Sequence, residues 1–369
     1  LFRYFTPAYD GFEGFIDEFG MSVVGNPKKG TKDKYGDLID MGSKEYLTKI
    51  REGFKNDTNK LAEHKRQFPW TPEEAFRVNT DTCLFDSERI YQQIDYIEGT
   101  GGAMVTKGDF RWQDGVRDSR VVWTPSAKGK WSVVSLPEQE KTNAKIKKFN
   151  GWSAGNELEY VSGCDPFDHD VTTDGRRSDA AAYMFRKLNV HDQDNSHMFV
   201  AQYIHRPPKA EMFFEDMLMM SVFYGAPMLV ENNKIGLIQY FKRRGYEGFL
   251  MARPESTHTK FSRKQTEVGI PATGSAVANS IVDSIQAYVY DYVGINGETG
   301  EVGRVFFYEL LKDWLGFDVN NRTKFDASMA SGFTLLASQK HVKPKIEIKR
   351  TAPFVHRYSN NGRLSKRIR

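Results

Sequence analysis

The sequence has only two cysteines, Cys83 and Cys164, and their separation along the chain gives no basis for a disulfide framework. It has no run of about 18 apolar residues, which excludes an ordinary transmembrane helix, and its first residues lack the layout of a signal peptide. Because 52 Lys and Arg residues face 48 Asp and Glu residues, neither charge dominates. These features predict a soluble protein of two or three globular domains with no membrane partner.

Positive charge is concentrated at the C-terminal end. Between Lys340 and Arg369, ten Lys or Arg residues face one acid, Glu347, so the rest of the chain is acidic overall. A basic segment of this kind is typical of contact with nucleic acid or another anionic surface, and solubility is the simpler alternative. The first residue, Leu1, is not Met, and we expect the chain to be part of a longer protein.

Composition divides the chain into four parts. Residues 1–80 are polar and of mixed charge, and we interpret them as a linker region. Residues 81–150 contain strand-like stretches at 108–112, 120–123 and 130–134, which predict a small β-containing connecting element. Residues 151–340 form the main domain, and residues 341–369 form the basic tail.

The main domain alternates short apolar stretches with two helical ones. Strands are expected at 158–165, 180–185, 198–204, 228–230 and 249–252, with helices at 209–224 and 234–244. Hairpin-type loops join the first three strands, and helices connect the later ones. Right-handed connections then place the fourth strand parallel to the first and next to it. This order predicts an α/β fold with a mixed five-stranded sheet flanked by helices.

Two of the expected strands end on an acid, the first on Asp165 and the fourth on Glu231. If these strands are parallel neighbours, the two carboxylates lie at the same edge of the sheet and repel each other unless a cation lies between them. Clusters of carboxylate oxygens suit the hard ions Mg²⁺ and Mn²⁺. The sequence therefore predicts a metal site, and the alternative is that these are unrelated strand-end acids.

A third acid is expected from a helix packed on the same edge. The stretch 325–336 has apolar residues at helical spacing and small residues that permit close approach, with Asp326 in its first turn. Asp283, in a helix expected at 276–292, competes for this role. We favour Asp326 as the third ligand, because a solvated helix acid is the simpler interpretation of Asp283.

Several segments carry a resemblance to a known family. They are FPWTPEEAF at 68–76, GCDPFD at 163–168, SDAA at 178–181, VENN at 230–233 and KFDASMASG at 324–332, with YFTPA at 4–8 and GFID at 14–17. In order and spacing they resemble the nuclease domain of tailed-bacteriophage terminase large subunits, and in particular those of the crAss-like phage group. The two N-terminal segments resemble the end of the family's ATPase domain.

The resemblance implies an RNase H-like (resolvase/integrase-type) fold and an endonuclease that cuts double-stranded concatemeric viral DNA during genome packaging. The residues that match the family's three acids are Asp165, Glu231 and Asp326. In such enzymes the acids bind two divalent ions, Mg²⁺ or Mn²⁺, of which one activates water and the other stabilises the leaving oxygen. Asp168 is a candidate accessory ligand, and a hydrated loop acid is its alternative interpretation.

Partners are implied by the same resemblance. They are double-stranded DNA, the portal protein, the small terminase subunit and the upstream ATPase domain of the same protein, acting together in the host cell cytoplasm. A motor domain requires the phosphate-binding pattern Gly-x-x-x-x-Gly-Lys-Ser/Thr, and the stretch GNPKKGTK at 25–32 lacks Lys directly after its second Gly. We therefore expect no ATPase activity from this chain.

DNA contacts are expected to be electrostatic and tolerant of sequence. The candidate residues are Lys242, Arg243, Arg244, Lys260, Arg263 and Lys264. For the first three, stabilisation of a helix C-terminus by cations is the alternative. Two other functions stay open: a related recombinase or junction resolvase with the same acids, and a non-enzymatic module that docks on DNA or on the portal through the basic tail.

Overall fold

The computed structural model describes most of the chain. The described residues are 4–55, 58–75, 83–100, 102–167, 180–189, 192–257, 268–272, 274–296 and 299–339, together with the short paired strands β10 (Arg357–Tyr358) and β11 (Leu364–Ser365). Four of the candidate site residues lie outside them: Asp168, Lys260, Arg263 and Lys264. Most of the basic tail also lies outside the described residues.

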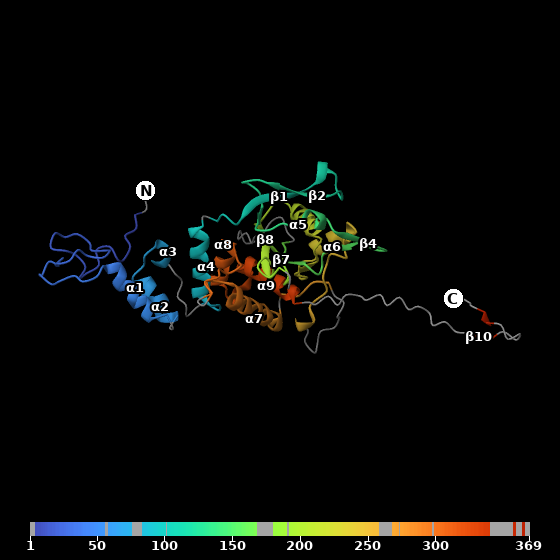
Figure 1. The fold of residues 1–369 in the computed structure, drawn as a ribbon. Helices are drawn as coiled ribbons and strands as arrows, with labels where there is room; N and C mark the ends of the chain where they lie inside the picture. Colours follow the sequence, from blue (N-terminus) through green and yellow to red (C-terminus); the bar gives the residue numbers. More distant parts are fainter. Residues whose placement is uncertain are drawn as a thin grey trace.

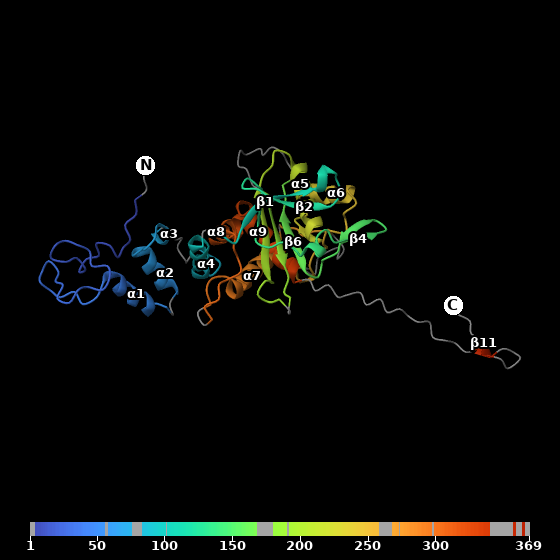
Figure 2. The ribbon, with the colours of Figure 1, turned by 45° about the horizontal axis from the view of Figure 1, so that its top comes forward.

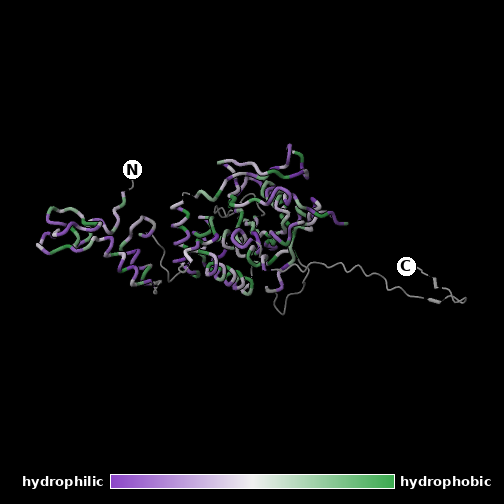
Figure 3. The backbone as a smooth tube through the Cα atoms, viewed as in Figure 1, coloured by the Kyte–Doolittle hydropathy of each residue, from purple (hydrophilic) through white to green (hydrophobic). Residues whose placement is uncertain are grey.

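The N-terminal part consists of turns followed by three helices. The helices are α1 (Ser43–Gly53), α2 (Thr58–Gln67) and α3 (Pro72–Ala75). In Figure 1 this part lies to one side of the sheet, next to α4 (Ser87–Gly99), and Figure 3 shows many hydrophilic residues along it. An ion pair joins the two parts, because Lys65 Nζ of α2 lies 2.5 Å from Glu88 Oε1 of α4.

A seven-stranded mixed sheet forms the centre of the molecule, in the order β2-β1-β3-β8-β7-β6-β9. The strands are β1 (Thr106–Trp112), β2 (Val121–Pro125), β3 (Trp131–Val133), β6 (Tyr160–Asp165), β7 (Ala180–Arg186), β8 (Met198–His205) and β9 (Met228–Val230). Neighbouring strands are antiparallel except β6 and β9, which are parallel. The predicted position of the fourth strand of the main domain, parallel to the first and beside it, is confirmed.

The prediction of a five-stranded sheet was wrong. Strand β3 pairs with β8, Trp131 lying opposite Tyr203, so β1, β2 and β3 extend the sheet of the main domain. Aromatic packing supports this junction, since the Trp131 ring lies 4.9 Å from that of Tyr203 and 5.2 Å from that of Phe110. A burial pattern within one strand shows that it is covered but does not show which distant strand it pairs with.

The fifth strand expected at 249–252 is present only as isolated bridges. Leu250 bridges Met228 in parallel and Ala252 bridges Val268 in antiparallel orientation. The backbone turns just before this point, because the N–H groups of Phe249 and Leu250 donate to carbonyls only three residues back, at 2.9 Å each. Those N–H groups are therefore not available for a continuous strand ladder.

Helices cover both faces of the sheet (Figure 2). On one face lie α5 (Ala210–Tyr224) and α6 (Gly236–Arg243), and on the other lie α4, α7 (Ser275–Tyr292), α8 (Tyr308–Gly316) and α9 (Asp326–Ser338). The remaining elements are the hairpin β4 (Lys145–Lys148) with β5 (Gly151–Ala154) and the 3₁₀ turns η2 (Gln113–Gly115), η3 (Gln139–Lys141), η4 (Glu255–Thr257) and η5 (Val319–Lys324). Helices were predicted where α5, α6, α7 and α9 form, whereas α4 and α8 were not anticipated. Among the described residues, no helix combines the length and apolar character needed to cross a lipid bilayer.

Helix α9 packs directly on β6, the strand next to the edge strand β9. Its side chains are buried from Ala327 to Ala337. A Cβ on Gly163 of β6 would lie only 2.3 Å from the backbone nitrogen of Thr334 and 2.7 Å from the carbonyl oxygen of Ala330. Only glycine fits at this position, and its missing side chain lets the helix backbone approach the strand.

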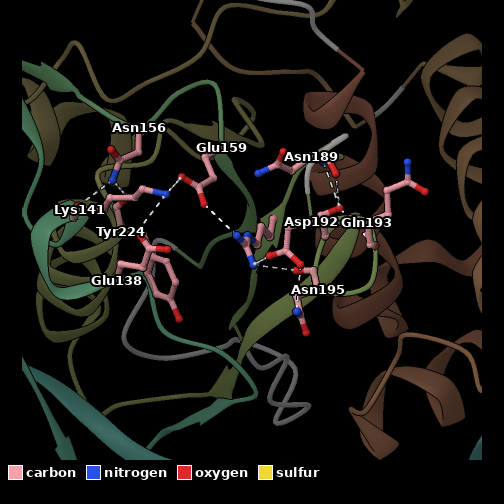
Figure 4. A network of polar contacts seen from close by, with 11 residues as sticks. Glu138, Lys141, Asn156, Glu159, Asn189, Asp192, Gln193, Asn195 and Tyr224 are labelled. Carbon is pink, nitrogen blue, oxygen red and sulfur yellow. Dashed lines mark hydrogen bonds and ion pairs between the residues drawn. The ribbon is translucent and has the colours of Figure 1, made fainter.

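Figure 4 shows a polar network around Glu159 and Asp192. It lies where β6 begins and β7 ends, at the opposite end of the sheet from Asp165. The Arg186 guanidinium at the end of β7 lies 3.2 Å from Glu159 and 3.0 Å from Asp192, and it donates to the carbonyl of Asn195 at 3.0 Å. Lys141 lies 3.0 Å from the second oxygen of Glu159. The network ties the start of β6 to the loop after β7, which makes Arg186 a stabilising residue.

Replacing Arg186 with Met should lower the free energy of unfolding by about 2 kcal/mol, because three charge-assisted contacts of a 12% exposed side chain are lost. Urea denaturation measures the change. Lys141→Met is the matched control, since this lysine is 38% exposed and the loss of its ion pairs with Glu138 and Glu159 should cost no more than about 0.5 kcal/mol. An equal loss in the two variants would show that Arg186 does not anchor this end of the sheet.

Candidate active site

Two acids lie side by side at the C-terminal ends of neighbouring strands. Strands β6 and β9 run parallel with Cys164 opposite Val230, so the next residues, Asp165 and Glu231, are neighbours at the same end. The backbone N–H of Glu231 donates to the Cys164 carbonyl at 3.1 Å, which fastens the two strand ends together. The sequence-based prediction that these two residues meet is therefore confirmed.

Both side chains are on the face of the sheet that α9 covers. Side chains alternate along a strand, and Val161 and Leu229 belong to the core on the α9 side. Asp165 lies four residues after Val161, and Glu231 lies two residues after Leu229. Both separations are even, so the two acids share that face. Each is only 7% exposed. The two carboxylates are thus withdrawn from solvent, and each needs a partner that compensates for the lost hydration.

Lys234 is that partner. Its Nζ lies 2.8 Å from Asp165 Oδ1 and 3.1 Å from Glu231 Oε2, between the two carboxylates. Asn233 donates from Nδ2 to Glu231 Oε1 at 3.0 Å, which orients the second oxygen toward the lysine. The sequence analysis missed Lys234; the available signal was a lysine three residues after a strand-end acid.

The electrostatics of this cluster follow from burial and charge. Burial raises the pKa of the Asp165 carboxyl well above its ordinary value, Lys234 opposes this shift, and the negative charge of Glu231 adds to it. Burial works against the charge on Lys234, but the two carboxylates outweigh it and raise the pKa of the lysine above its ordinary value. The pair of acids therefore keeps a positive charge between them.

A short segment supports Glu231 from the outer edge of β9. Ile270 donates its N–H to the Val230 carbonyl at 2.9 Å, and Asn232 donates to the Ile270 carbonyl at 3.0 Å. Gly269 has φ +82°, and a Cβ there would lie 2.6 Å from the Val230 oxygen. Glycine is required at this position, because both the backbone conformation and the close approach exclude a side chain.

The third acid, Asp326, is the first residue of α9 and is half-buried. Arg322, four residues before it, donates to the Ala272 carbonyl at 2.9 Å, just beyond Ile270, so α9 begins at the sheet end that carries the acid pair. Asp283 is exposed on α7. Within the described part of the chain, no three His, Cys, Asp or Glu residues form a group that could hold a metal ion. The ligand role of Asp326 therefore stays a prediction.

The predicted DNA-binding cluster at 242–244 lies at the other end of α6. This helix begins two residues after Lys234 and is eight residues long, so its ends are about 12 Å apart. Arg244 is held by two carboxylates, at 2.6 Å from Glu215 and 2.8 Å from Asp118. Lys242 pairs with Glu247 at 3.2 Å, and Arg243 lies 3.9 Å from Glu211. Arg244 therefore links α6 to α5 and to the loop after β1.

The site combines hard oxygen donors, a buried setting and a compensating cation. Carboxylate oxygens are the donors that hard divalent ions prefer, and in this structure the Lys234 ammonium group lies between them. A search of protein-family models, of curated proteins and of solved structures gave no match to this chain.

Proposed function

We propose that this chain is a metal-dependent DNA endonuclease with an RNase H-like fold, the nuclease part of a viral DNA-packaging terminase. The observation that carries the proposal is the pair Asp165 and Glu231, which leave parallel neighbouring strands and converge on the Lys234 ammonium group at 2.8 and 3.1 Å. Two buried carboxylates in this arrangement form a site for a cation rather than two surface acids.

The sheet topology supports the fold assignment. Within the main domain the strands lie in the order β8-β7-β6-β9, with β7 antiparallel to its neighbours and β9 parallel to β6. Leu250 bridges β9 on its outer side, in the place expected for a fifth strand. Helices lie on both faces, and α9 crosses the strand that carries the first acid. These are the features on which the proposed RNase H-like assignment rests.

The residues present fit divalent metal ions. Asp165 and Glu231 offer carboxylate oxygens, the ligands that Mg²⁺ and Mn²⁺ prefer, and the position between them already holds a positive charge. Asp326 would add a third carboxylate from α9. Bound ions would supply the activation of water and the charge stabilisation that phosphodiester hydrolysis requires. The protein holds the carboxylates in place through the β6–β9 pairing and through Asn233.

The proposed substrate and partners rest on the sequence resemblance to terminase large subunits. The proposed substrate is double-stranded viral DNA, and the proposed partners are the portal protein, the small terminase subunit and the ATPase domain of the same protein, in the host cell cytoplasm. A junction resolvase would use the same acid pair on branched DNA. A docking module would bind DNA or the portal without needing the pair.

Plasmid cleavage tests the proposal. The purified chain should nick and linearise supercoiled DNA in Mn²⁺ or Mg²⁺ and leave it intact in EDTA, with agarose electrophoresis as the readout. Binding of DNA without cleavage in either ion would contradict the nuclease proposal and favour a docking module. Cleavage confined to a four-way junction, offered beside a linear duplex of the same length, would favour a resolvase.

A further inference from the structure

A second polar feature lies at the same end of the sheet as the acid pair. It is a cleft of about 220 Å³, and its lining includes Lys107, Lys128, Lys130, Gln202, His205 and Glu309. It opens between the ends of β1, β3 and β8 and the start of α8. None of its lysines or its histidine belongs to the basic clusters recognised in the sequence.

The strand register relates this cleft to the acid pair. Asp165 of β6 lies opposite Ala181 of β7, which lies opposite Ile204 of β8, a residue of the cleft lining. With strands about 4.8 Å apart, Ile204 is roughly 10 Å from Asp165 across the sheet. Lys130 directly precedes β3, whose first residue Trp131 pairs with Tyr203, so it continues the same row one strand further, at roughly 15 Å.

The cleft also shares a face of the sheet with the acids. Ala181 and Ile204 pack in the core on the α9 side, where Asp165 and Glu231 lie. Gln202, two residues before Ile204, donates to Glu309 of α8 at 3.2 Å, which places α8 beside the cleft. A ligand in the cleft and a ligand at the acid pair would therefore contact the same face of the protein at the same end.

The charge of the cleft comes mainly from two exposed lysines. Lys107 and Lys128 form no ion pair with any residue that the structure describes. Lys130 is held by Asp216, at 2.5 and 2.6 Å, and Glu309 accepts the hydrogen bond from Gln202. Two positive groups are thus available to a ligand, while Lys130 and Glu309 have protein partners.

The backbone holds these two lysines close together. Ser126 begins the turn that carries Lys128, and its N–H donates to the Lys107 carbonyl at 2.9 Å. The turn also rests on β1, because a Cβ on Gly129 would lie 2.4 Å from the backbone of Gly108. The pair is part of a rigid strand-and-turn element, so binding an anion there requires little reorganisation of the backbone.

We infer that this cleft binds the phosphate backbone of the DNA strand that the acid pair cuts, a few nucleotides from the scissile bond. The inference rests on the proposed nuclease function. Ammonium groups without protein partners are what a phosphate backbone requires, and they carry no sequence preference. Lys107 lies on β1, one strand beyond β3 and so roughly 20 Å from the acid pair across the sheet. Phosphates on one strand advance about 3.4 Å along the axis per nucleotide, so this distance spans about six nucleotides. The cleft sets where the duplex lies relative to the acids.

Fluorescence anisotropy with a labelled 30-base-pair duplex in EDTA tests the inference, because no cleavage is expected without metal. The variant is Lys107→Glu with Lys128→Glu. Its matched control is Lys147→Glu with Lys148→Glu, which makes the same charge change on exposed lysines of β4, in the hairpin that leads into the start of β6 and so away from Asp165. We expect binding at least about tenfold weaker for the cleft variant and changed by less than about twofold for the control.

Salt dependence adds a second readout. The slope of log affinity against log salt concentration should fall by about 2 in the cleft variant, one for each lost phosphate contact, and stay unchanged in the control. Equal weakening in both variants, unchanged binding in the cleft variant or a wild-type chain that does not bind the duplex would each overturn the inference. If the wild-type chain cuts plasmid but the cleft variant binds DNA normally, the cleft inference fails and the nuclease proposal stands. If the cleft variant binds more weakly but the wild-type chain cuts no DNA, the nuclease proposal fails and DNA binding by the cleft stands.

Discussion

Asp165→Asn and Glu231→Gln should each reduce metal-dependent plasmid cleavage by at least about 1,000-fold, because each removes a negative ligand from a site built around two carboxylates. Both substitutions keep the shape of the side chain, so the sheet should stay folded. Initial rates of loss of supercoiled plasmid in Mn²⁺ measure the effect. Isothermal titration with Mn²⁺ gives a second readout, in which both variants should bind the ion more weakly.

The third acid can be tested by the same assay. Asp326→Asn should lose cleavage to a similar degree, whereas Asp283→Asn, on the exposed side of α7, should keep the wild-type rate. Asp283→Asn also serves as the control for the two substitutions above, since all four variants exchange a carboxylate for an amide. Retained cleavage in Asp326→Asn with loss in Asp283→Asn would reverse the assignment, and full activity in Asp165→Asn would exclude the proposed site.

Lys234→Met should lower the free energy of unfolding by about 3 kcal/mol in EDTA, because it leaves two buried carboxylates without the cation between them. Methionine keeps most of the length and apolar volume of the lysine stem, so the loss reports charge rather than packing. If the acid pair binds divalent ions, adding Mn²⁺ should raise the stability of this variant more than that of the wild-type protein. Denaturation in urea with and without Mn²⁺ measures both effects.

Lys242→Met is the matched control for this experiment. Lys242 forms an ion pair with Glu247 at 3.2 Å, but both side chains are exposed, at 45% and 49%. Its loss should change stability by no more than about 0.5 kcal/mol, with or without Mn²⁺. A Lys234→Met protein as stable as the wild type, or one whose stability does not respond to Mn²⁺, would show that the acid pair is not a cation site.

Local pattern was sufficient for most elements of the main domain. The apolar stretches at 180–185 and 198–204 became β7 and β8, and the helical spacing at 209–224 became α5. The position of β9 beside β6 followed from the handedness of connections, which is set by the twist of the strands and not by any particular side chain. Helix α4 was missed because its buried residues face a core built by α7 and α8, more than 170 positions later in the chain.

Short-range periodicity and a general rule of chain geometry were enough to place Asp165 and Glu231 at the ends of two strands and to make those strands neighbours. The surroundings of these two acids depend on contacts between distant parts of the chain. The ammonium of Lys234 reaches both carboxylates only because the β6–β9 register brings them within its reach, and Arg244 is held by Asp118, 126 positions away. The same holds for the pairing of β3 with β8, because contacts between distant segments depend on how the whole chain packs and leave no local pattern.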